Sequence, residues 1–222
     1  MAIFLAFMAY CSGNEIIGKE TNIVFSRMDD LVPDEEHITP RNAANIHYFC
    51  LLIGSIVSIF TIQIFGRKTL AVAGMAVNAV VFTVMSITIH YKMVEVTSIM
   101  IFSGAFLTAC TYSSVYDVYT TEVSSDVSLA LVQVTIPITA LLNSQTAVHI
   151  IDAIGLAKWF SIYAVLDIIA FFVLIFVMKE SKGLTDKQKK RLYRPEVLNM
   201  STSPSEGLSD SEEEELRPEQ KA

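Results

Sequence analysis

Long apolar runs alternate with short polar links over most of this chain. Each run has about 20 residues or more, which lets one helix cross the roughly 30 Å hydrocarbon core of a bilayer. A helix also satisfies its own backbone hydrogen bonds, which no water can satisfy inside lipid. The pattern therefore predicts an all-α, polytopic membrane protein with six transmembrane helices, over Ile3–Phe25, Ala43–Phe65, Leu70–His90, Val94–Val118, Val127–Ile150 and Ala157–Met178.

The first run has a second interpretation, because Ala2–Cys11 alone has the length of a signal-peptide core. A secretory signal begins with a basic segment, and no basic residue precedes this run. The apolar pattern also continues to Phe25, which favours a membrane span.

Basic residues are distributed unequally over the polar links, and this predicts the orientation. Short loops rich in Lys and Arg stay on the cytoplasmic side. On one side lie Arg67, Lys68, Lys179, Lys182, Lys187, Lys189, Lys190, Arg191 and Arg194, and on the other Arg27, Arg41, Lys92 and Lys158. We therefore expect an integral multi-pass protein of the plasma membrane with both termini in the cytoplasm.

The apolar runs divide the chain into three regions, with a six-helix bundle over 1–178. The basic juxtamembrane segment 179–194 either lies against an anionic inner leaflet or simply anchors the last helix. The tail 195–222 is rich in Ser, Pro and Glu and holds most of the net charge of −7, so we expect it to be disordered.

The tail contains two candidate phosphorylation sites, Ser209 and Ser211, directly before the acidic run Glu212–Glu215. An acid-directed kinase would add further negative charge at this place. The alternative is a solvated acidic tail without a switching role.

Composition excludes several classes of function. Hydrophobic residues make up 52% of the chain and charged residues 18%, which is too apolar for an ordinary soluble domain. No stretch interleaves basic and aromatic residues, so nucleic acid is not an expected partner. The three cysteines lie inside apolar runs without metal-ligand spacing, and no nucleophile–base pair or phosphate loop is present. We therefore expect no enzyme activity, no metal and no cofactor.

Four short motifs, in order along the chain, resemble the sugar-porter branch of the major facilitator superfamily. They are Ser12-Gly13 with Ile23-Val24-Phe25, then Gly66-Arg67-Lys68-Thr69-Leu70, Tyr119-Thr120-Thr121-Glu122, and Glu180-Ser181-Lys182-Gly183-Leu184-Thr185. Their order is that of the seventh helix, the turn between the eighth and ninth, the end of the tenth, and the segment after the twelfth. The chain thus resembles the C-terminal six-helix half of such a transporter, from Met1 to about Lys190.

This resemblance implies movement of a small polar solute, with a hexose among the candidates, by alternating access against a second six-helix half or a second copy. Several family positions differ here: Ala9-Tyr10, Glu15, Gln63, Tyr116-Asp117 and Lys179 replace two glutamines, an asparagine, an acid, a Pro-Trp pair and a proline. The hexose site is therefore not recognisable. A non-transporting membrane regulator, scaffold or relic half-transporter is the alternative.

The resemblance also implies a charge latch on the cytoplasmic face, in which Arg67 and Lys68 meet Glu122 and Glu180. Ion pairs at a partly dehydrated interface hold one conformer and break in another. The alternative is that the two basic residues only set the orientation of the helices.

Five residues are candidates for solute binding or ion coupling. Glu15 and Lys19 are four residues apart in an apolar run, where charges face a cavity or one another. They form either a solute or proton site or a mutually neutralised pair. Ser114 and Asp117 share a helix face with other small polar residues, which is more often a packing surface. Gln133 is the fifth candidate. Asp167, in the last span, is expected to be neutral or paired.

Overall fold

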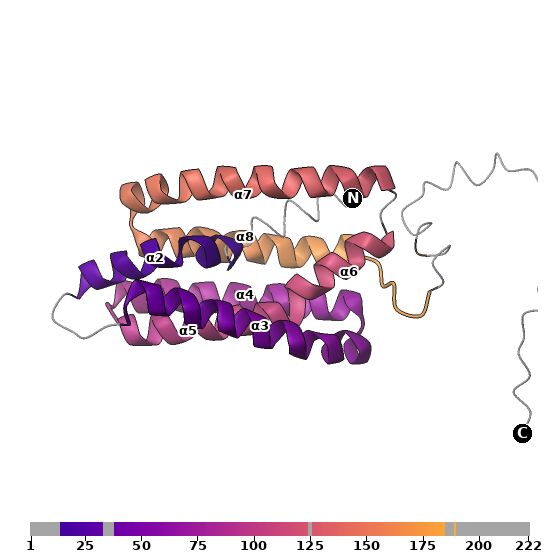
Figure 1. Ribbon diagram of the computed structural model, residues 1–222, viewed down its shortest axis with the longest axis horizontal. Coiled ribbons are helices and arrows are strands. Elements are labelled where there is room, and N and C mark those ends of the chain that lie inside the picture. The colour runs from indigo at the N-terminus through magenta and orange to yellow at the C-terminus, as the bar shows by residue number, and fades with distance from the viewer. Residues whose placement is uncertain (1–13, 33–37, 124–125, 185–188, 190–222) are drawn as a thin grey trace, which may run out of the picture. The chain divides into compact units, whose positions relative to one another are not determined.

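The computed structural model describes residues 14–32, 38–123, 126–184 and 189, and every regular element within these ranges is helical (Figure 1). The elements are α2 (Asn14–Leu31), α3 (Pro40–Phe65), α4 (Arg67–His90), α5 (Val94–Thr108), the π-helical turn η1 (Ala109–Ser113), α6 (Ser114–Val123), α7 (Asp126–Ile154) and α8 (Leu156–Val177).

The described residues contain five helices that are long and apolar enough to cross a membrane. They are Pro40–Phe65, Arg67–His90, Val94–Glu122, Leu129–Ile154 and Leu156–Val177. An all-helical, multi-pass membrane protein is therefore confirmed at this level. The predicted first span, Ile3–Phe25, lies partly outside the described residues, and α2 covers only its second part. The predicted tail 195–222 lies wholly outside them.

Several helices extend further than hydropathy predicts. The predicted first span ends at Phe25, but α2 continues to Leu31. Similarly, α6 reaches Val123, and α7 continues to Ile154, so that Gly155 alone joins it to α8. Hydropathy marks only the part of a helix that must lie in hydrocarbon, whereas backbone hydrogen bonding continues into the polar layer outside it.

Two glycines make the tightest connections of the bundle. Gly66 joins α3 to α4 with φ of 82°, and Gly155 joins α7 to α8 with φ of 87°. Positive φ of this size is sterically costly for residues that have a Cβ, so glycine permits these one-residue reversals. We call the two ends of the bundle the Gly66 end and the Gly155 end. Arg67 and Lys68, predicted to lie in a turn, already belong to α4.

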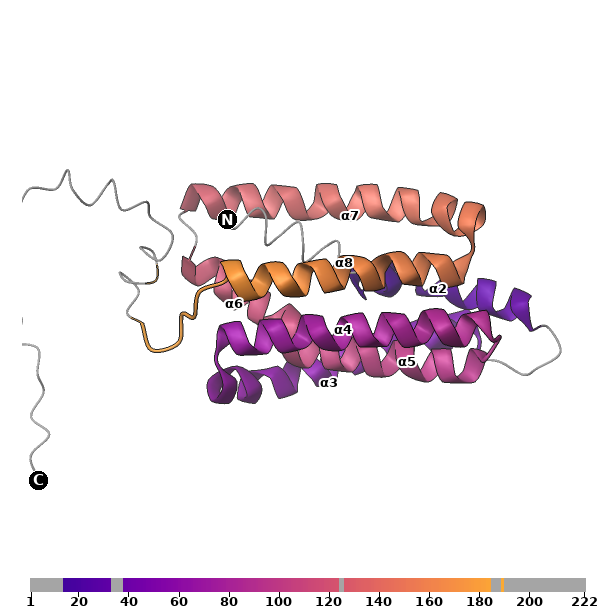
Figure 2. The same cartoon turned by 180° about the vertical axis from the view of Figure 1, so that it is seen from behind.

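The most extensive contact between helices lies between α4 and α8, which run antiparallel side by side (Figures 1 and 2). Phe82 of α4 contacts Phe160 and Tyr163 of α8, with ring centroids 6.1 and 5.9 Å apart, and Trp159 packs tilted against Phe160 and edge-on against Tyr163. Burial of such aromatic groups contributes a large share of packing energy. These contacts fix the frame from which the two ends of the bundle are built.

The outer faces of the helices are apolar. Phe60 of α3 is 64% exposed and Phe176 of α8 is 82% exposed, together with many neighbouring Ile, Leu and Val side chains. Such surfaces are unfavourable in water and match lipid or another polypeptide. The exposed faces therefore agree with a bundle embedded in a bilayer.

Candidate functional site

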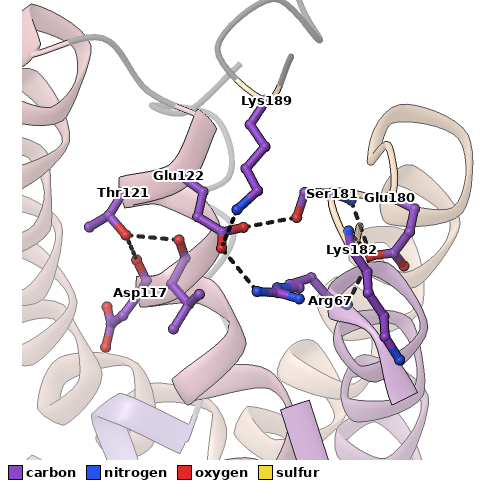
Figure 3. Close-up of polar contacts among 9 residues, drawn as sticks. Arg67, Asp117, Thr121, Glu122, Glu180, Ser181, Lys182 and Lys189 are labelled. Atoms are coloured by element: carbon purple, nitrogen blue, oxygen red, sulfur yellow. Dashed lines mark hydrogen bonds and ion pairs between the residues drawn. The ribbon is translucent and has the colours of Figure 1, made fainter. Parts of the chain in front are cut away.

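A charged cluster at the Gly66 end is centred on Glu122, near the end of α6 (Figure 3). Its Oε1 accepts hydrogen bonds from Arg67 Nη2 and Lys189 Nζ, each at 3.0 Å. Its Oε2 accepts one from Ser181 Oγ, also at 3.0 Å. The three charged side chains are only 13–20% exposed. Ion pairs in such partly dry surroundings are stronger than those on an open surface.

Glu180, just after α8, caps the start of α4. Its Oε1 accepts from the backbone N–H of Arg67 at 3.0 Å, and its Oε2 from that of Lys68 at 3.1 Å. The N–H groups of Ser181 and Lys182 also donate to Oε1. The N-cap residue of α4, Gly66, supplies no side-chain hydrogen bond to the helix start. A remote carboxylate thus satisfies N–H groups that a helix start leaves open and meets the positive end of its dipole.

These contacts make the cap depend on pH. Partial burial raises the pKa of Glu180, but the backbone hydrogen bonds outweigh it and hold the pKa below its ordinary 4.5. The stability from the cap is therefore complete above this value and is lost as pH falls through the lower, folded-state pKa. We expect Glu180→Gln to unfold at lower temperature than wild type at about pH 7. The difference in unfolding temperature should shrink as the pH is lowered below 4.5 and through the lower folded-state pKa of Glu180. A difference in unfolding temperature between Glu180→Gln and wild type that stays constant at all pH values would contradict the cap.

All four residues of the predicted latch lie at this end, but their contacts differ from the predicted pairs. Arg67 meets Glu122 through its side chain, whereas Glu180 meets the backbone of Arg67 and Lys68. Lys68 Nζ donates to the carbonyl oxygen of Ile175, at 2.9 Å, and contacts no acidic side chain in the described part of the chain. The action of this cluster as a latch stays a prediction.

A π-helical turn interrupts the helix that ends in this cluster. Between α5 and α6, η1 widens the helix by one residue and frees backbone carbonyls from their usual donors. Ser114 Oγ donates to the carbonyl of Ala109 at 3.0 Å, and Thr61 Oγ1 of α3 donates to that of Cys110 at 2.9 Å. Such turns occur frequently at functional sites. Sequence reasoning missed this turn, because no proline or glycine marks it.

Two glycines on neighbouring helices, Gly54 of α3 and Gly74 of α4, pack directly against η1. A Cβ on Gly74 of α4 would lie 2.6 Å from Thr111 Oγ1 and 2.9 Å from the backbone N of Tyr112. A Cβ on Gly54 of α3 would lie 2.7 Å from that of Ala109. The close approach of both helices to η1 therefore requires residues without a side chain.

We expect Gly74→Ala to destabilise the bundle by about 2 kcal/mol, because the added methyl group overpacks the contact with η1. The measurement is the midpoint of thermal unfolding in detergent. Ala73→Val is the matched control, since it adds volume at the adjacent, exposed position of α4. Equal midpoints for the two variants would contradict tight packing at Gly74.

A second polar contact, missed by sequence reasoning, joins α2 to α7. Ser144 Oγ of α7 donates to Glu20 Oε1 of α2, and Glu20 departs from helical geometry with φ of −102° and ψ of 17°. Glu20 is half-buried within the bundle. A half-buried ionisable residue between helices of a membrane protein is a candidate for a functional site. In the sequence, Glu20 is marked only as a carboxylate in an apolar run, and the prediction for that run named Glu15 and Lys19 instead.

The other predicted site residues are more scattered. Glu15 and Lys19 lie on α2, but the structure does not describe their side chains. Asp117 is exposed on α6, five residues before Glu122 (Figure 3), and Gln133 is exposed on α7. Ser209 and Ser211 lie outside the described residues. No His, Cys, Asp and Glu group in the described part of the chain could hold a metal ion.

The sequence was also compared with known protein families. The sequence model of a family described as "Sugar (and other) transporter" matches residues 37–193. The chain belongs to this transporter family. No curated protein matches the chain significantly. The matched range contains three of the four motifs and all described members of the charged cluster, whereas Ser12-Gly13 and α2 precede it. The family consists of transporters rather than enzymes, in agreement with the expected absence of enzyme activity.

Proposed function

We propose that this chain forms a six-helix half of a transporter that moves a small polar solute, with a sugar favoured, by alternating access. Membership of the sugar transporter family carries the proposal. Facilitators of this kind move two six-helix halves about a central site. A second half, on a longer chain or in a second copy, would supply the opposite wall of the solute path.

The charged cluster fits the role of a latch in such a cycle. Glu122 joins three segments distant in sequence: the start of α4, the end of α6 and the chain after α8. Side-chain ion pairs at one end of a bundle can form in one conformer and break in another without unfolding of the helices. By the distribution of Lys and Arg, this end would face the cytoplasm.

Glu20 supports placing the solute path between α2 and α7. It combines a half-buried carboxylate, a broken helix and a hydroxyl partner, Ser144, and both groups can exchange hydrogen bonds with a polyol. Glu15, Lys19, Ser114, Asp117 and Gln133 remain further candidates for binding or coupling. The absence of the family's paired glutamines at Ala9-Tyr10 leaves the choice of solute open.

Uptake into proteoliposomes tests the function. The polypeptide is purified at its native length and assayed with radiolabelled hexoses, pentoses and polyols. An immunoblot against 209–222 first establishes whether that length is near the 24.6 kDa of this chain or about twice as large. We expect uptake that Glu20→Gln abolishes and that Glu95→Gln, at the exposed start of α5, leaves intact.

Two outcomes would oppose transport. Uptake equal to that of empty vesicles for every solute would contradict the proposal. Protection from proteolysis by a solute that is not taken up would favour a non-transporting regulator instead.

A further inference from the structure

The Gly155 end contains a cavity of about 490 Å³, on the opposite side of the bundle from the charged cluster. Four elements meet there: the ends of α2, α4 and α7 and the start of α8 (Figure 1). The volume lies in the range of small-molecule sites. Nothing in the proposed transport cycle uses this cavity.

Both apolar and basic side chains line the cavity. Leu31, Ile89 and Ile151 contribute apolar surface, and the basic residues are Arg27, His90, Lys92 and Lys158. An apolar wall with convergent charged groups is the usual composition of a ligand site. The sign of the available charge decides which ligand fits.

The two acidic residues of the cavity are already paired. Arg27 Nη2 lies 2.5 Å from Asp152 Oδ1, and its Nη1 lies 3.6 Å from Asp30 Oδ2. Lys92 and Lys158, by contrast, form no ion pair with any residue that the structure describes. Among the described residues, the cavity thus carries three cationic side chains against two carboxylates, and the ammonium groups of Lys92 and Lys158 lie outside these ion pairs.

Lys92 also holds an unusual backbone conformation. Its φ is 59°, in the left-handed region, and Lys92 N–H donates to Ile89 O while Met93 N–H donates to Thr88 O. This is the helix end at which glycine is the usual residue, because a Cβ in the left-handed region lies too close to the backbone. A lysine at this position therefore lowers backbone stability, but it places an ammonium group at the cavity.

We propose that the Gly155-end cavity binds a ligand of net negative charge that carries a phosphate group on an apolar body. The lysines would meet the phosphate oxygens through charge-assisted hydrogen bonds, and the apolar walls would cover the body. An anionic phospholipid is one source of such a ligand, and a free organic phosphate is another. The proposal concerns binding only and does not depend on transport.

The test follows the thermal unfolding midpoint of the whole chain, purified in a non-ionic detergent. The additions are phosphatidylglycerol, zwitterionic phosphatidylcholine, inorganic phosphate, hexyl phosphate, and sodium chloride at matched ionic strength. We expect phosphatidylglycerol or hexyl phosphate to raise the midpoint in a saturable way, and chloride and phosphatidylcholine to leave it unchanged. A shift with the lipid alone identifies the membrane as the source, and a shift with hexyl phosphate identifies a free ligand.

Three variants separate binding from folding. Lys92→Gly should relieve the left-handed strain, so that the unliganded midpoint is unchanged or higher, yet should weaken binding about tenfold. Lys158→Ala should weaken binding similarly. Arg41→Ala is the matched control, since it removes one exposed positive charge at the same end but outside the cavity. Equal weakening by Arg41→Ala, or no shift with any phosphate in the wild type, would overturn the proposal.

Discussion

Replacing Glu122 by Gln should lower the free energy of unfolding by about 2–3 kcal/mol. The change keeps the shape of the side chain but leaves Arg67 and Lys189 without a counter-charge, and these side chains are only 20% and 13% exposed. Removal of one partner from a buried ion pair is strongly destabilising, because the remaining charge stays desolvated. Chemical or thermal unfolding in detergent measures the effect.

Asp117→Asn provides the matched control for this experiment. It removes the same charge from the same helix, but its side chain is exposed. A double-mutant cycle with Arg67→Ala and Glu122→Ala should further give a coupling energy of about 1–3 kcal/mol. Equal effects of Glu122→Gln and Asp117→Asn, with no coupling, would mean that the cluster contributes nothing to the stability of this conformer.

Replacing Asp167 by Leu should have the opposite sign and raise the free energy of unfolding by about 1–4 kcal/mol. Asp167 is fully buried in α8, and neither carboxyl oxygen has a hydrogen-bond partner among the described residues. Its expected pairing is thus not found in the described part of the chain, and a neutral carboxyl group remains the prediction. A polar group buried without a partner costs stability that an apolar group of similar size does not.

Asn78→Leu is the contrasting variant. Asn78 is also fully buried, on the facing helix α4, but its Oδ1 accepts a hydrogen bond of 2.6 Å from Thr108, whereas its Nδ2 has no partner among the described residues. We therefore expect Asn78→Leu to be less stable than wild type and Asp167→Leu to be more stable. A fall in the unfolding midpoint for Asp167→Leu would contradict the prediction and indicate a partner elsewhere in the chain. Loss of solute uptake without loss of stability would assign Asp167 a role in transport.

The sequence by itself determined the helical membrane architecture and the family. A span requires only that about 20 consecutive residues be apolar, which is a local property and can be read directly. Because successive spans reverse direction, the same pattern placed Arg67, Glu122 and Glu180 at one end. The motifs at these positions lie inside the range that the transporter family matches.

Only the tertiary structure decided which groups meet. Glu180 binds the backbone at the start of α4 rather than a basic side chain, and Ser144 of α7 meets Glu20 of α2. The close contact of Gly74 with η1 was likewise invisible in the sequence. Hydropathy fixes how far a helix crosses the bilayer but not its rotation about its own axis. That rotation is set by packing between residues far apart in the chain, and it determines which side chains come within hydrogen-bonding distance.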